Sequence, residues 1–181
     1  MRAPKILLLG DRRLAAFTRP DPDGTETQIV GWREWVALPE LGIARVKAKM
    51  DTGARSSALH ANSIEPYEHN GAPCVRFDVM GEAENVPWHE APVADRRLVR
   101  SSNGETELRY VIRTALSIAG QTWPVDITLT NRERMDLPML IGREALAGRA
   151  LVDPQRSWLC GRPHWRSLEP RRAHRRSGDR P

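Results

Sequence analysis

The chain has 181 residues, of which 40% are hydrophobic, and a formal net charge of +5. This length fits one domain with its own core plus tails, and the composition excludes a fibrous or wholly disordered chain. The charge excess lies in residues 161–181, where seven Arg outnumber one Asp and one Glu, so residues 1–160 are formally neutral. Global charge is therefore no argument for an acidic partner of the main domain.

The two cysteines, Cys74 and Cys160, are far apart in the sequence and have no metal-ligand neighbours. We expect free thiols in a reducing compartment, because two thiols do not make the disulfide framework of a secreted domain. The apolar run at residues 5–10 is too short for a membrane span, and no small-residue cleavage site follows it. These features predict a cytoplasmic protein without a membrane segment.

Polarity patterns predict many short strands along the chain. Residues 1–28 are expected to be an N-terminal extension and linker, because residues 18–27 are polar and rich in Pro and Gly. Alternating apolar residues and turn signals indicate the remaining elements. Strands are expected at 32–38, 43–50, 75–79, 97–100, 107–116 and 125–129, turns at 39–42, 70–71, 101–104 and 117–123, and a loop at 81–92. Short strands at this spacing predict an all-β domain that closes into a barrel.

The most informative segment is residues 49–57, Lys-Met-Asp-Thr-Gly-Ala-Arg-Ser-Ser, where a strand is expected to end in a sharp turn. Residues two apart on a strand share a face. One face is therefore expected to contain Arg45, Lys47, Lys49 and Asp51. Thr52 can bond locally through its hydroxyl, and Gly53 permits a tight backbone turn. Asp-Thr-Gly alone also fits an ordinary turn without chemistry.

A second segment, residues 138–148, reads Pro-Met-Leu-Ile-Gly-Arg-Glu-Ala-Leu-Ala-Gly. It predicts an apolar strand that runs into Gly142, followed by a short helix near 143–148. Together the two segments resemble the retropepsin-like acid proteases, which have an Asp-Thr-Gly-Ala turn early and an apolar-apolar-Gly-Arg segment late. The resemblance implies a closed acid-protease β barrel with one short helix.

Longer motifs resemble one bacterial family of this fold, labelled RimK-associated or "ATP-dependent zinc protease". The motifs are VKAKMDTGARSSALHA (46–61), RSSNGETELRYVIRT (100–114), LTNRERMDLPMLIGREAL (129–146) and Leu-Val-Asp-Pro (151–154). The resemblance implies a retropepsin-like domain over residues 29–160. Residues 161–181 are then a separate Arg-rich tail, which we expect to be disordered because it contains few apolar residues.

Peptide hydrolysis by carboxylates needs one group to activate water and another to protonate the carbonyl oxygen, so two carboxyls share one proton. The resemblance assigns catalysis to Asp51, Thr52 and Gly53, and the chain contains one Asp-Thr-Gly without an internal repeat. The second carboxyl then comes from a homodimer with a two-fold axis or from the same chain. The sequence does not choose among Asp126, Asp136, Glu144 and Asp153.

The cations around Asp51 favour the ionised form of a nearby carboxylate and suit an acidic substrate. The family is associated with ATP-dependent ligases that add glutamate to a protein tail, which implies a poly-α-glutamate or glutamylated protein substrate. The expected substrate-binding residues are Lys47, Lys49, Arg55, Ser102, Asn103, Arg109, Arg132 and Arg143. Residues 101–104 fit either a flap over the substrate or a plain hairpin turn.

Two functions remain open from the sequence: an aspartic-type endopeptidase that cuts acidic tails, and a non-catalytic module that binds them. Despite the zinc in the family label, the chain has no His-Glu-x-x-His, and its five histidines lack paired ligand spacing. We therefore predict no metal and no cofactor, with His60 packed as a structural residue. A phosphate-binding loop is also missing from the sequence, so ATP is expected to belong to a partner ligase.

Overall fold

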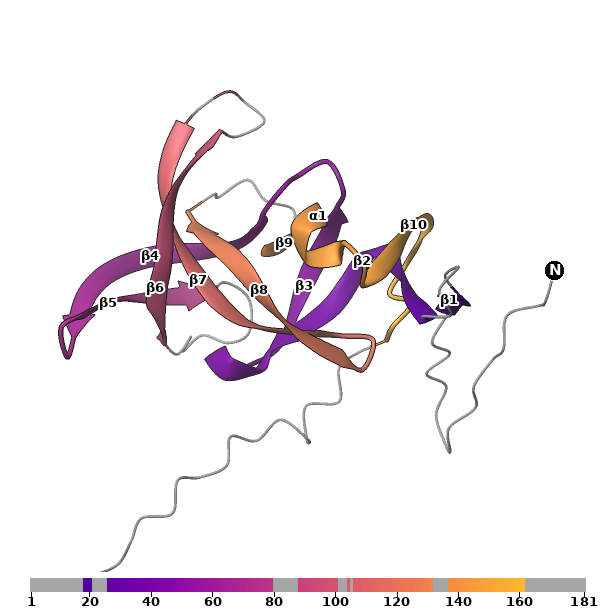
Figure 1. The fold of residues 1–181 in the computed structure, drawn as a ribbon, viewed down its shortest axis with the longest axis horizontal. Helices are drawn as coiled ribbons and strands as arrows, with labels where there is room; N and C mark the ends of the chain where they lie inside the picture. The colour runs from indigo at the N-terminus through magenta and orange to yellow at the C-terminus, as the bar shows by residue number, and fades with distance from the viewer. Residues whose placement is uncertain are drawn as a thin grey trace, which may run out of the picture.

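The computed structural model describes residues 18–20, 26–79, 88–100, 104, 106–131 and 137–161. The predictions for residues 1–17, and for the Arg-rich tail from residue 162 onward, lie outside this part. The strands are β1 Thr18–Pro20, β2 Glu26–Leu38, β3 Ile43–Asp51, β4 Ser57–His69, β5 Ala72–Val79, β6 His89–Arg100, β7 Thr106–Ile118, β8 Gln121–Thr130, β9 Met139–Gly142 and β10 Ala150–Ser157. A 3-10 helix, η1, covers Pro39–Leu41, and the α-helix α1 covers Arg143–Leu146. The prediction of an all-β fold with a short helix after Gly142 is confirmed (Figure 1).

Six of the strands pair in a ring-like arrangement. β3 pairs antiparallel with β2 and parallel with β9, which pairs with β4. β4 then runs parallel to β8, β8 pairs with β7, and a contact between Ala37 and Ser117 joins β7 back to β2. β5 and β6 extend the sheet beyond this ring, and β10 pairs parallel with β2. The ring brings the two ends of the sequence signature, on β3 and β9, next to each other.

The alternation predicted for residues 43–50 is confirmed in β3. Val46, Ala48 and Met50 are buried in the core, whereas Lys47 and Lys49 on the opposite face are exposed. Side chains such as Phe77, Leu59, Ile112 and Leu116 from the other strands fill the same core. Burial of this apolar face stabilises the strand and thereby fixes the direction in which Asp51 leaves it.

The turn predicted at residues 70–71 is also confirmed. Asn70 and Gly71 have φ values of 51° and 77°, and they connect β4 to β5 as a two-residue hairpin. Such turns need a left-handed backbone at both central positions, and Asn-Gly is favoured there because both residues adopt that conformation readily.

Two of the sequence expectations are wrong at their edges. The loop expected at 81–92 ends earlier than predicted, because His89–Pro92 pair with residues Cys74–Phe77 of β5. The linker expected at 18–27 includes β1, since Thr18–Pro20 pair with Glu26–Gln28. In both places Pro and polar residues interrupt the apolar alternation by which a strand is predicted. Such residues are typical of strands near a sheet edge.

The strands β4 and β10 were missed by the sequence analysis. The first five residues of β4, 57–61, are all buried, so this part of the strand shows no alternation of polar and apolar residues. It lies between β8 and β9, and a strand covered on both faces reads as a continuous run of small and apolar residues. β10 is short of apolar residues and gave no periodic signal.

A buried carboxylate connects β2 to the segment after β10. Glu34 is 0% exposed, and its side chain accepts hydrogen bonds from the backbone N–H groups of Gly31 (2.7 Å), Leu159 (2.8 Å) and Cys160 (3.2 Å). Burial and the negative charge of Glu34 together raise the pKa of the Cys160 thiol to about 12. Cys160 and Cys74 are both free, as predicted. The α-helix of the described residues is too short and too polar to cross a membrane.

We predict that Glu34→Gln lowers the free energy of unfolding by about 2 kcal/mol, because an amide NH₂ replaces an acceptor in front of buried N–H donors. Urea denaturation measures this change. Glu40→Gln is the matched control, since Glu40 is exposed and accepts the N–H of Ala115, and it should change stability by less than about 0.5 kcal/mol. Equal effects of the two substitutions would contradict the role given to Glu34.

Candidate active site

Asp51 is the last residue of β3, and its carboxylate closes the turn that follows. Its Oδ1 accepts the backbone N–H groups of Gly53 and Ala54, both at 3.1 Å. Its Oδ2 lies 3.4 Å from Lys49 Nζ, and the side chain is 26% exposed. One carboxylate oxygen is thus fixed by the backbone, while the group as a whole remains open to a reactant.

The start of α1 holds this turn in place. β3 and β9 pair with Asp51 opposite Gly142, so the helix begins beside the turn. The backbone N–H groups of Arg143 and Glu144 donate to the carbonyls of Ala54 (2.9 Å) and Arg55 (3.1 Å). The first N–H groups of a helix have no partner within it, and here the turn supplies the acceptors. Arg143 also donates from Nη1 to the carbonyl oxygen of Gly53 at 3.3 Å.

Gly142 is required by a close approach between two backbones. A Cβ at this position would lie 2.5 Å from the Ser56 carbonyl carbon and 2.7 Å from the Arg55 oxygen. The Gly142 N–H donates to Ser57 Oγ at 3.2 Å. A larger residue would push β9 and α1 away from the Asp51 turn, which explains the glycine between the apolar strand and Arg143.

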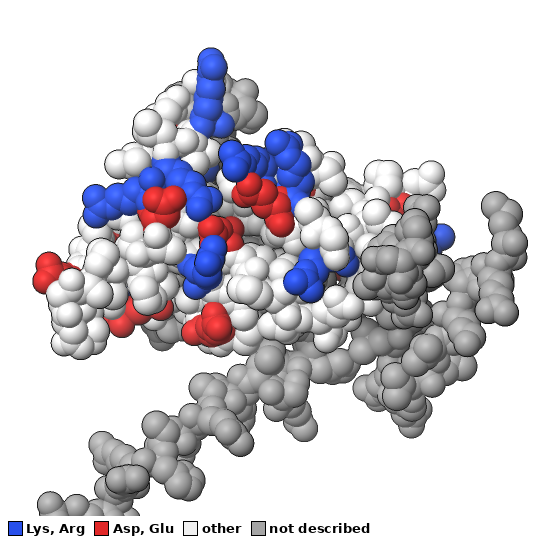
Figure 2. Space-filling model, viewed as in Figure 1, with Lys and Arg blue, Asp and Glu red and all other residues white. Residues whose placement is uncertain are grey.

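A pocket of about 1040 Å³ opens beside Asp51. Its floor includes Ala58, Thr128 and Leu140 from three neighbouring strands, and the β6–β7 hairpin forms one wall. Its charged lining residues are Asp51, Arg55, Arg97, Arg100, Arg109, Asp126 and Glu144. Figure 2 shows basic side chains around a hollow in this face of the molecule, with acidic side chains among them. The lining of the pocket therefore carries many charges of both signs.

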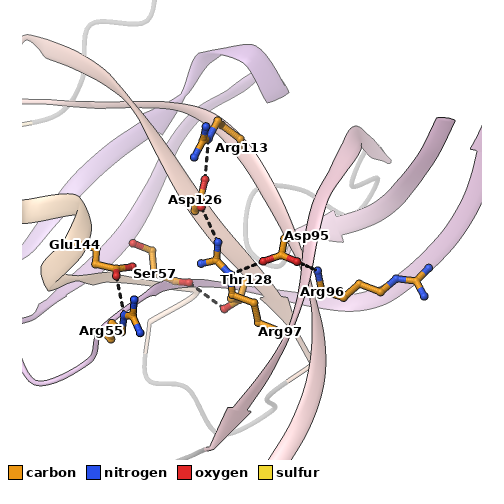
Figure 3. A network of polar contacts seen from close by, with 9 residues as sticks. All are labelled: Arg55, Ser57, Asp95, Arg96, Arg97, Arg113, Asp126, Thr128 and Glu144. Carbon is orange, nitrogen blue, oxygen red and sulfur yellow. Dashed lines mark hydrogen bonds and ion pairs between the residues drawn. The ribbon is translucent and has the colours of Figure 1, made fainter.

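Most of these charges are paired. Asp126 Oδ2 lies 2.9 Å from Arg97 Nη2, and Asp126 Oδ1 lies 2.8 Å from Arg113 Nε. The pair between Arg97 and Asp126 links the hairpin strand β6 to β8 across β7, and Arg97 also contacts Asp95 of its own strand at 2.8 Å (Figure 3). On the other side of the pocket, Glu144 and Arg55 form an ion pair at 2.7 Å.

The lowered pKa of Asp126 shows that this network favours its charged form. Partial burial by itself would raise the pKa, but the hydrogen bonds and charges of Arg113 and Arg97 outweigh that effect and lower it. The hydrogen bond from Arg97, helped by the backbone N–H of Arg96, lowers the pKa of Asp95 as well. Both carboxylates are thus ionised at neutral pH and anchor the hairpin.

The structure brings some of the predicted site residues together and separates others. Asp51, Gly53, Arg55 and Arg109 line the pocket, and Thr52 is exposed at the turn beside it. Lys49 contacts Asp51 from outside this lining. Lys47 instead lies over the ring of Trp35, 5.3 Å from its centroid. Ser102, Asn103 and Arg132 lie outside the described residues, so their roles stay predictions.

Sequence reasoning missed Arg97 and Arg100 as lining residues. Arg97 lies directly opposite Arg109 in the β6–β7 pairing. The expected hairpin could have indicated this, because residues opposite each other on paired strands share a face. Within the described ranges, no three His, Cys, Asp or Glu side chains lie close enough together to hold a metal ion.

The chain is similar to several known proteins. A family described as "Retropepsin-like aspartic endopeptidase RimB" matches residues 29–163. A probable alpha-L-glutamate ligase of Shewanella pealeana is 43% identical over 136 residues, which is 74% of this chain and 30% of the relative. One of Parasynechococcus marenigrum is 44% identical over 140 residues, 76% of this chain and 30% of the relative. The chain therefore spans about 30% of the length of these curated relatives.

A solved structure is similar as well. The crystal structure of a protein with unknown function from Legionella pneumophila has a TM-score of 0.63 and 28% identity, and the match covers 73% of this chain and 97% of that one.

We predict that Gly142→Ala lowers the free energy of unfolding by about 3 kcal/mol, because the added Cβ overlaps the backbone of Ser56. Chemical denaturation measures the loss. Gly148→Ala is the comparison: its Cβ would meet no atom within 4 Å, but its φ of 67° makes alanine cost about 1 kcal/mol. Equal losses would show that the close approach at Gly142 is unimportant.

We predict that Asp126→Asn is less stable than the parent protein at pH 7, because the substitution removes the ion pairs with Arg97 and Arg113. The loss should be only about 1 kcal/mol, since Arg113 is largely exposed to solvent. A carboxyl whose pKa is lowered by folding stabilises the protein above its unfolded-state pKa. That contribution disappears as the pH falls through the lowered pKa, so the two proteins should converge in strong acid. Urea denaturation between pH 7 and pH 2 tests this, with Glu65→Gln as an exposed ion-pair control. A difference that grows on acidification would contradict the assignment.

Proposed function

Because the chain belongs to the RimB-like family of retropepsin-like aspartic endopeptidases, we propose that it is an aspartic-type peptidase that uses Asp51 to hydrolyse peptide bonds. The observation that supports this most directly is the position of the Asp51 carboxylate. It is fixed through Oδ1 by two backbone N–H groups and faces a pocket of about 1040 Å³. Thr52 and Gly53 shape the turn that presents it.

The proposed chemistry needs a second carboxyl group that shares a proton with Asp51. A carboxylate takes a proton from water as the water oxygen adds to the carbonyl carbon, and the protonated partner donates to the carbonyl oxygen. The C–N bond then breaks as the leaving nitrogen accepts a proton. Among the described pocket residues, the other carboxylates are Asp126 and Glu144, and both are held in ion pairs with Arg. The Arg partners of Asp126 lower its pKa, so Asp126 is a poor proton donor, and Glu144 Oε1 is already engaged by Arg55.

Because Asp126 and Glu144 are both engaged by Arg, we propose that the second carboxyl comes from another copy of the chain, in a homodimer in which each subunit contributes Asp51. Thr52 and Gly53 are exposed at the tip of the turn, so a second copy can approach there about a two-fold axis. The supporting contacts from α1 lie behind the turn, on the carbonyls of Gly53 and Ala54. A partner turn would therefore meet the open side.

We propose that the substrate is an acidic peptide, in particular a poly-α-glutamate tail. Four Arg line the pocket, and Lys49 lies beside Asp51. In relatives named probable alpha-L-glutamate ligase, the matched segment is about 30% of a longer chain. A domain that occurs within such a chain is well placed to trim what a ligase makes, and we assign the ATP-dependent ligase as a functional partner in the cytoplasm.

A non-catalytic role remains the alternative, in which the same pocket only binds acidic tails. The contact between Lys49 and Asp51 favours it, because an ion pair at 3.4 Å occupies the carboxylate oxygen that a second carboxyl would have to approach. The two functions differ in turnover: a binding module retains the peptide intact.

We predict that the protein cleaves poly-α-glutamate in preference to neutral peptides and that Asp51→Asn lowers the rate by about a thousandfold or more, as expected for loss of an acid–base group. Mass spectrometry of the products measures cleavage, and sedimentation measures the mass of the active species. Asp153→Asn, which alters a β10 carboxylate away from the lining residues, should retain activity. Full activity in Asp51→Asn would exclude the mechanism, and binding without any cleavage by the parent protein would support the binding module.

A further inference from the structure

Arg109 of β7 is a buried cation that lines the pocket, and the described residues leave part of its hydrogen-bonding capacity unused. Its side chain is 4% exposed, and its Nε lies 2.8 Å from Glu107 Oε2. Within the described part of the chain, its Nη2 has no hydrogen-bond partner and is closed to water. Such a donor is unfavourable in a folded protein unless a ligand completes it.

The geometry of the guanidinium indicates what the missing partner is. Nε–H and one N–H of Nη2 point the same way and match the two oxygens of a carboxylate. Glu107 uses this pair only in part, because its Oε2 accepts from Nε and also from Thr130 Oγ1 at 3.2 Å. The Nη2 half of the fork is left for another anion.

The neighbouring charges direct an anion to the same place. Arg109 lies directly opposite Arg97 across the β6–β7 hairpin, and like charges in this arrangement repel each other. Arg97 is neutralised by Asp95 and Asp126, with both contacts shorter than 3.0 Å. Arg109 pairs with Glu107 through Nε, finds no partner for Nη2 among the residues that the structure describes, and lines the same pocket as Asp51.

We propose that Arg109 recognises the side-chain carboxylate of an acidic residue in the peptide bound beside Asp51. This inference rests on the proposed peptide substrate and adds the residue that distinguishes glutamate from glutamine. Because Nη2 is closed to water in the free protein, the proposal requires the atoms that cover it to move aside when the carboxylate oxygen binds. The uncharged amide of glutamine cannot replace a carboxylate at a buried guanidinium without losing the charge-assisted contact.

The test measures binding, so that it does not depend on cleavage. Fluorescent pentaglutamate and pentaglutamine, both amidated at the C-terminus, are titrated with full-length Asp51→Asn protein. In this background Arg109→Gln should weaken pentaglutamate binding by about ten- to a hundredfold and leave pentaglutamine binding nearly unchanged. A pentaglutamine with a free C-terminus separates recognition of a side chain from recognition of a terminal carboxylate, and tighter, Arg109-dependent binding of that peptide would overturn the proposal.

Arg100→Gln is the matched control, because it removes the same charge from an exposed position in the same pocket. Its effect should be smaller and should fade as salt is raised, since exposed charges are screened more than buried ones. Equal effects of Arg100→Gln and Arg109→Gln at every salt concentration would overturn the proposal.

Glu107→Gln keeps the test valid if Arg109→Gln fails to fold. The amide oxygen still accepts from Nε, but the competing negative charge is gone, so pentaglutamate should bind about tenfold more tightly. Pentaglutamine binding should not change. At high salt, where the general effect of removing a negative charge is screened, a purely structural Arg109 predicts equal or weaker pentaglutamate binding in Glu107→Gln, and that result would overturn the proposal. If the parent protein does not cleave pentaglutamate, the peptidase function is contradicted, but this binding test still applies.

Discussion

The contact between the backbones of Gly142 and Ser56 is the constraint on which the site depends. It lets β9 lie beside β3 with α1 starting next to the Asp51 turn. The first N–H groups of the helix can then donate to the carbonyls of that turn, and Arg143 adds a side-chain hydrogen bond. The same pairing of β9 with β3 and β4 continues the ring, so the support of the carboxylate and the closure of the fold are one structural feature.

The pocket is built from opposite charges that are mostly bound to each other. Ion pairs hold Asp126 to Arg97 and Arg113, and Glu144 to Arg55. These pairs set the positions of the hairpin and of α1 without adding much net charge. The reactivity and selectivity that we propose therefore rest on two other groups, which are Asp51 at the turn and Arg109 in the wall.

The sequence was most informative where a local pattern determines the structure. Alternation in residues 43–50 and the residues around Gly142 predicted β3, the turn and α1, because each depends on neighbours along the chain. The ion pair between Arg97 and Asp126 was not predictable in this way, since it spans three strands and requires the register of both pairings. The buried clamp of Glu34 was missed for a similar reason: its partners Leu159 and Cys160 are more than 120 residues away.

The lowered pKa of Asp126 has a consequence for how a pH–activity profile should be interpreted. Because Arg113 and Arg97 lower its pKa, this carboxylate stays charged to a lower pH than an ordinary aspartate does. The hairpin wall therefore keeps its anchor to β8 while ordinary carboxyl groups, such as those of an acidic peptide, become protonated. A loss of activity that begins in this range then reports on the peptide before it reports on the architecture of the pocket.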